Sequence, residues 1–128
     1  YPGRKKAAQF LPRGLARPLP EAPDGRLEPV GGLQPHWTPG HAPGHVVYHH
    51  ERDGVLLAGD LFNAKKGRLR FPLFTFEKAR ALESSLIVRE LQPAHLEACH
   101  GGPVPRPADQ LDDYLRAHAR CAGAGAQA

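Results

Sequence analysis

The first half of the chain shows short apolar runs separated by turn signals, a pattern typical of β-strands. It predicts a short strand over residues 26–30 and further strands over 33–37, 45–50 and 54–59, with a hairpin turn at Asp53-Gly54. The run over 54–59 is almost continuously apolar, which favours a strand buried on both faces. This strand ends directly before Asp60.

The apolar spacing changes to a helical period after Thr75, which we expect to cap a helix over residues 75–91 that ends before Pro93. The apolar stripe of this helix consists of Phe76, Ala79, Leu82, Leu86 and Leu91. A strand over 95–99 follows, and Pro107 opens a last helix. The apolar side of that helix carries Leu111, Tyr114, Leu115 and His118. These elements predict an α/β fold with a mixed or largely antiparallel sheet and two flanking helices.

Proline and glycine divide the chain into three parts. Residues 1–23 are rich in proline and arginine and are predicted to form a loop or arm. Residues 24–122 form the predicted domain, and residues 123–128 a flexible tail. A chain of 128 residues normally forms one domain. It contains no methionine, so we expect it to be an excised or processed piece of a longer protein.

The composition limits where in the cell the protein is expected. No apolar run approaches the length of a membrane span, so no membrane partner is expected. The two cysteines, Cys99 and Cys121, do not make a disulfide framework, which favours a reducing, cytoplasmic location. Cys99 is predicted to be a small buried apolar residue.

The formal net charge is +4, and Lys65, Lys66, Arg68 and Arg70 form a basic cluster. We interpret the cluster as a solvated loop. A nucleic-acid partner is not favoured, since no aromatic residues alternate with the basic ones.

Three candidate metal ligands follow predicted strands: His41, Asp60 and His100. His41 and His100 lie among glycine and proline, which constrain the backbone around them. Asp60 ends an apolar strand, where an isolated carboxylate is costly unless it is paired or bound to a metal. Each alone could be an ordinary surface histidine or a turn-forming aspartate. Together they indicate a site for a metal such as zinc, because strand ends at one sheet edge converge.

His45 lies four residues after His41, but Pro43 and Gly44 make a helix with paired histidine ligands improbable. We predict that His45 is not itself a metal ligand. It either contacts the ligands or packs in the core, and in both cases it orients the loop. No role is assigned to His36, His49, His50, His95 or His118.

Three segments carry a family resemblance: Thr-Pro-Gly-His-Ala-Pro-Gly-His over 38–45, Leu-Ala-Gly-Asp over 57–60, and Ala-Cys-His-Gly-Gly-Pro over 98–103. In order and spacing they resemble the C-terminal half of the metallo-β-lactamase superfamily, most of all its glyoxalase II-like hydrolases. The resemblance covers about residues 24–115.

The resemblance implies half of a four-layer αβ/βα sandwich and a hydrolase with one or two zinc ions, iron and manganese being alternatives. His41 would complete one metal site and His100 the other. Asp60 would bridge them and is the residue assigned to catalysis, which proceeds through a metal-activated water attacking an ester, thioester or related bond of a small-molecule substrate.

The family's His-x-His-x-Asp-His motif is absent from this sequence. The resemblance therefore implies that the chain alone is inactive, and that its partner is the missing N-terminal half of the same domain. The sheet face that packs on that half would be an apolar patch, which predicts pairing or self-association as a homo-oligomer. Two alternatives stay open: a non-catalytic remnant of the fold that acts as a scaffold or binding module, and a nucleic-acid-processing member of the superfamily.

Overall fold

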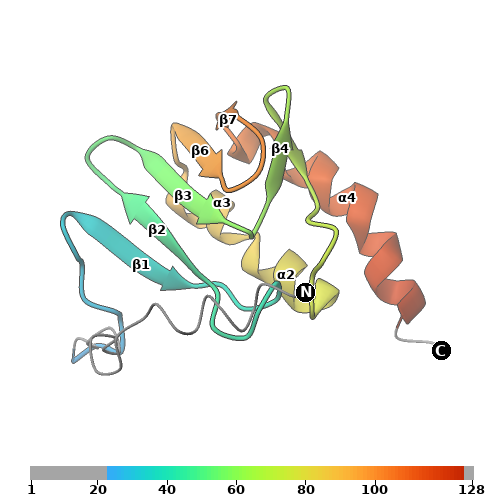
Figure 1. The fold of residues 1–128 in the computed structure, drawn as a ribbon, viewed down its shortest axis with the longest axis horizontal. Helices are drawn as coiled ribbons and strands as arrows, with labels where there is room; N and C mark the ends of the chain where they lie inside the picture. The colour runs from blue at the N-terminus through green and yellow to red at the C-terminus, as the bar shows by residue number, and fades with distance from the viewer. Residues whose placement is uncertain (1–22, 126–128) are drawn as a thin grey trace, which may run out of the picture.

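The computed structural model of the protein describes residues 23–125. Its centre is a five-stranded mixed sheet in the order β1-β2-β3-β6-β7 (Figure 1). The strands are β1 (Leu33–Trp37), β2 (Val46–His50), β3 (Val55–Gly59), β6 (His95–Ala98) and β7 (Pro103–Pro105). The predicted strands over 33–37, 45–50, 54–59 and 95–99 are confirmed within one residue at each end. The predicted strand over 26–30 is wrong, because only isolated bridges occur there.

A hairpin turn joins β2 to β3, as the Asp53-Gly54 pair predicts. Gly54 has φ of 66°, and its N–H donates to the carbonyl oxygen of Glu51 at 3.3 Å. That left-handed backbone is accessible to glycine at little cost.

The basic cluster over 65–70 lies on a two-stranded ribbon, β4 (Asn63–Lys65) paired with β5 (Arg68–Arg70), so the predicted loop is wrong. Lys66 and Gly67 both have positive φ, of 51° and 73°, as a two-residue hairpin turn requires. Ala64 and Leu69 point into the core. The Gln110 side chain fixes the ribbon to the last helix by accepting from Leu69 N and donating to Gly67 O, at 2.9 and 2.8 Å.

The predicted helix over 75–91 is broken into α2 (Lys78–Ser84) and α3 (Ile87–Leu91). The predicted cap is also wrong: the N-cap is Glu77, and the Thr75 hydroxyl donates to Pro72 O at 3.1 Å. The break occurs where the Ser85 hydroxyl donates back to Leu82 O at 2.5 Å, and the backbone bonds tighten to a three-residue spacing.

The last helix, α4 (Ala108–Gly125), follows Pro107 and continues past residue 122, where the sequence places the end of the domain. The predicted arm lies outside the described residues except for Pro23, and so do residues 126–128 of the predicted tail. None of the described helices is long and apolar enough to cross a membrane.

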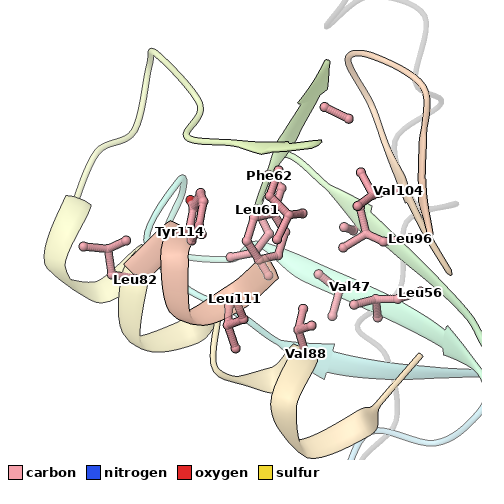
Figure 2. Packing of buried hydrophobic residues seen from close by; sticks show 13 residues of the cluster. Val47, Leu56, Leu61, Phe62, Leu82, Val88, Leu96, Val104, Leu111 and Tyr114 are labelled. Carbon is pink, nitrogen blue, oxygen red and sulfur yellow. The ribbon is translucent and has the colours of Figure 1, made fainter. Parts of the chain in front are cut away.

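The hydrophobic core lies between the helices and one face of the sheet (Figure 2). Strand register places Leu56, Leu96 and Val104 on this face. Val88 of α3 and Leu111 of α4 pack against it. Leu57 points to the opposite face and is 38% exposed, so the expectation of a strand buried on both faces is wrong for the described residues.

Candidate metal site

Strand direction brings the three predicted ligands together. β1 and β3 are each antiparallel to β2, and β3 is parallel to β6, so β1, β3 and β6 all end at the same edge of the sheet. His41, Asp60 and His100 follow these three strands, in that order. Residues that are distant in the sequence therefore lie at one edge.

Asp60 lies between the two histidines. Its Oδ2 is 3.6 Å from His41 Nε2, and its Oδ1 is 3.5 Å from His100 Nε2. The side chains of His41 and Asp60 are 27% and 33% exposed, whereas that of His100 is 73% exposed. Each carboxylate oxygen thus faces a different imidazole, in a position that solvent can reach.

His45 connects Asp60 to the loop that carries His41. Its Nε2 accepts a hydrogen bond from the Asp60 backbone N–H at 3.0 Å, so its proton lies on Nδ1, which is 2.9 Å from Thr38 Oγ1. Burial, aided by repulsion from His41, lowers the pKa of His45 against the opposing effect of Asp60. A neutral ring is the form that can accept from Asp60 N–H.

The 38–45 loop is fixed from the side of α2. The backbone N–H groups of Phe76 and Glu77 donate to His41 O at 3.3 Å and to Gly40 O at 2.8 Å. Gly40 has φ of 144°, and a Cβ there would lie 2.4 Å from the Ala81 backbone. The loop therefore packs directly on the helix.

The loop that carries His100 rests on β4. Ala64 N–H donates to His100 O at 2.8 Å, and a Cβ on Gly101 would lie only 2.0 Å from Ala64 O. Cys99 N–H donates to Gly59 O at 2.9 Å, which connects this loop to the end of β3. The Cys99 side chain is exposed, so the expectation that it is buried is wrong. The strand ends at Ala98 and releases it from the core.

Nitrogen and carboxylate oxygen are suitable donors for zinc and other divalent metals. Bonds of about 2.0–2.2 Å hold two donor atoms of one ion roughly 3.3–3.6 Å apart. The separations of 3.5 and 3.6 Å fit one shared ion for each histidine–aspartate pair. Over residues 23–125, no group of three or more His, Cys, Asp or Glu residues is arranged to hold a metal ion. The site is thus two pairs that share Asp60.

Among the residues that the structure describes, His41 Nδ1 is buried and has no hydrogen-bond partner, although a ligand histidine usually donates from its second nitrogen. Asn63 Oδ1 is also buried without a hydrogen-bond partner within residues 23–125. The two histidine–aspartate pairs therefore fit two partial metal sites. Two buried polar atoms, one of them on His41, lack hydrogen-bond partners within the described residues.

Sequence reasoning missed Thr38 and Ala64 as supports of the site. Thr38 stands at the start of the Thr-Pro-Gly-His segment, so its position was a usable signal. Ala64, like Phe76 and Glu77, supports the site through a backbone hydrogen bond. Such a bond does not depend on the type of side chain, so the sequence carries no signal for it.

The model of a family described as the metallo-beta-lactamase superfamily matches residues 2–100. The protein YybB of Bacillus subtilis (strain 168), named a probable metallo-hydrolase, is 33% identical over 117 residues. That match covers 90% of this chain and 51% of YybB, so the chain spans about half the length of this curated relative.

Solved structures agree with the fold. The metallo-beta-lactamase family protein TTHA1429 from Thermus thermophilus superposes with a TM-score of 0.60 at 32% identity, covering 83% of this chain and 36% of that one. A beta-lactamase domain protein from Burkholderia ambifaria has a TM-score of 0.60 at 25% identity, covering 84% and 33%. The mixed sheet and its helices correspond to half of an αβ/βα sandwich, as predicted.

Proposed function

The chain belongs to the metallo-β-lactamase superfamily, and on that premise we propose that it supplies His41, Asp60 and His100 to the metal centre of a hydrolase. The observation that carries this proposal is the position of Asp60, with one oxygen facing each histidine at 3.5–3.6 Å. A carboxylate placed in this way suits a bridge between two ions.

The metal would be zinc, one or two ions, with iron or manganese compatible with the same donors. When bound, it would lower the pKa of a water molecule and polarise the bond to be hydrolysed. Asp60 would hold the two half-sites at a fixed separation. His45 would fix the Asp60 backbone through its Nε2, and Thr38 would hold the His45 ring in that orientation.

Three ligands divided between two half-sites leave each of them incomplete, since catalytic zinc usually has three protein ligands. We therefore propose that the remaining ligands come from an N-terminal half that packs on the sheet face carrying Leu57, and that the 128-residue chain alone is inactive. The substrate would be a small ester, thioester or related molecule, as in the glyoxalase II-like branch, and the location would be cytoplasmic.

Metal analysis of the whole protein tests the ligand assignment. Purified protein should contain one or two equivalents of zinc, iron or manganese, and Asp60→Asn should lower the affinity for added zinc by at least about tenfold, the size of effect seen when groups around a metal are lost. Asp53→Asn is the matched control, because Asp53 is an exposed aspartate in the β2–β3 turn.

Activity is measured on the same proteins with a panel of small esters and thioesters. We expect hydrolysis by the whole protein, loss of hydrolysis with Asp60→Asn, and none by the 128-residue chain. Whole protein that binds no stoichiometric metal would instead favour the scaffold alternative and would contradict the proposal.

A further inference from the structure

The five consecutive backbone carbonyl groups centred on His41 all accept hydrogen bonds. Backbone N–H groups donate to the three central ones, whereas side chains donate to the two at the ends. The Ser84 hydroxyl donates to Pro39 O at 2.6 Å, and the Trp37 indole N–H donates to Pro43 O at 2.8 Å. Proline has no N–H, so a hydrogen bond can hold its backbone only at the carbonyl group.

One face of α2 is connected to both ends of this loop. Arg80 and Ser84 lie one helical turn apart on α2, and Ala81 between them meets Gly40. Ser84 bonds to the start of the loop directly. Arg80 acts at the other end, because its guanidinium lies over the Trp37 ring, 5.2 Å from the centroid, in a cation–π contact.

His41 depends on this backbone more than a ligand histidine usually does. Its Nδ1 has no hydrogen-bond partner within residues 23–125, whereas such a partner usually orients the ring of a ligand. The loop therefore sets the direction in which the His41 side chain leaves the backbone. With the loop held, His41 Nε2 lies 3.6 Å from Asp60 Oδ2, a separation that suits a shared ion.

The two side-chain bonds differ in their exposure to solvent. Pro39 is buried and Ser84 is half-buried, so loss of the Ser84 hydroxyl leaves a buried carbonyl group without its donor. Trp37 is 59% exposed, so water can take the place of its N–H at Pro43 O. Of the two bonds, the one from Ser84 should hold the loop more strongly.

We propose that Ser84 and Trp37 are positioning residues, which hold the loop of His41 in its ligand-bearing conformation without requiring a bound metal. They act through the carbonyl groups of Pro39 and Pro43, each two positions from His41. The inference rests on the proposed function, since His41 is a ligand only in that assignment. A loop that is already in place loses little conformational freedom when a metal binds, which strengthens binding.

Hydrogen exchange of the metal-free whole protein tests the holding of the loop. The exchange rates of the amides over residues 38–45 should rise by at least about fivefold in Ser84→Ala and by about two- to fivefold in Trp37→Phe. Trp37→Phe keeps an aromatic ring for Arg80 and removes the N–H donor. Unchanged exchange in both variants would overturn the proposal, and a change in only one would overturn it for the other residue.

Ser85→Ala is the matched control for these variants. It removes a hydroxyl group at the next position, which donates to Leu82 O of α2 at 2.5 Å and not to the loop. This variant should leave exchange over residues 38–45 unchanged. Equal effects of Ser84→Ala and Ser85→Ala would show a general loosening of the helix and would overturn the positioning role.

Zinc affinity of the same whole proteins, measured by competition with a chromophoric chelator, tests the consequence for the metal. The apparent Kd rises in inverse proportion to the fraction of protein whose loop is in place. Zinc should therefore bind at least about fivefold more weakly to Ser84→Ala, about two- to fivefold more weakly to Trp37→Phe, and equally well to Ser85→Ala. At saturating cobalt the visible spectrum should keep its wild-type shape, because the ligands themselves are unchanged; a different shape in Ser84→Ala would contradict a role limited to positioning.

The inference and the proposed function fail in different ways. If the wild-type protein binds zinc and both variants bind it equally well, the positioning role fails and the ligand assignment stands. If the wild-type protein binds no zinc, the proposed function fails and hydrogen exchange alone decides. Faster exchange in the two variants would then support the holding of the loop, and unchanged exchange would overturn it.

Discussion

Replacing Gly40 with alanine tests whether the loop of His41 depends on direct contact with α2. The added Cβ would lie 2.4 Å from both Cα and N of Ala81, which is helix backbone and cannot rotate away. The loop would have to move away from the helix, at a cost in stability similar to that of overpacking a core, about 1–3 kcal/mol. The φ of 144° adds strain of about 1–3 kcal/mol for a residue with a side chain. We expect Gly40→Ala to lower the free energy of unfolding by about 2–6 kcal/mol, taking both costs together.

The assay is urea unfolding followed by far-ultraviolet circular dichroism and by fluorescence of Trp37, the only tryptophan in the sequence. Gly44→Ala is the matched control in the same loop, since a Cβ there meets nothing within 4 Å. Gly44→Ala should change stability by less than about 1 kcal/mol, in either direction. Equal midpoints for the two variants would refute the proposed contact between loop and helix.

Three further predictions concern the supports around the site. Gly101→Ala should destabilise the protein by about 2–6 kcal/mol, because its Cβ would lie 2.0 Å from Ala64 O at φ of 113°. Thermal unfolding is compared with that of Gly102→Ala, whose Cβ meets nothing within 4 Å, and comparable melting temperatures would count against the prediction. Gln110→Ala should lower the free energy of unfolding by about 1–3 kcal/mol, because it removes the hydrogen bonds that hold β5 on α4. The control is Asp109→Ala, at a neighbouring exposed position, and equal urea midpoints for the two variants would contradict the prediction. Burial lowers the pKa of His36, and repulsion from His49 adds to the effect. As the pH falls, His36 is therefore protonated in the unfolded chain before it is protonated in the folded one. The contribution of His36 to the free energy of unfolding should be fully present above about pH 6.5 and decrease below it. His36→Gln should flatten that acid slope in unfolding midpoints measured from about pH 7.5 to 5, and an unchanged slope would rule out His36 as its source.

The strand positions could be predicted because alternation and turn residues act locally. The Asp53-Gly54 turn and the apolar run before Asp60 each contain their own structural signal, and both predictions are confirmed. The predicted strand positions also led to the expectation that His41, Asp60 and His100 lie close together. Residues that follow strands of equal direction must meet at one edge, whatever the rest of the chain does.

The errors occur where a tertiary contact or a single side chain overrides the local pattern. The apolar stripe over 76–91 fits one helix, but the Ser85 hydroxyl competes for Leu82 O and the helix divides there. Lys65 to Arg70 looked like a solvated loop, because Lys66-Gly67 is not among the usual hairpin turns. The ribbon forms because Ala64 and Leu69 find a core and Gln110, 41 positions after Leu69, satisfies its backbone.

The proposed ligands His41 and His100 lie on loops that are held in place by other segments of the chain. Each of these two proposed ligands is positioned by backbone groups of residues 64–81, a segment that contributes no candidate ligand itself. A change at Gly40 or Gly101 is therefore expected to displace the proposed ligands without replacing either of them.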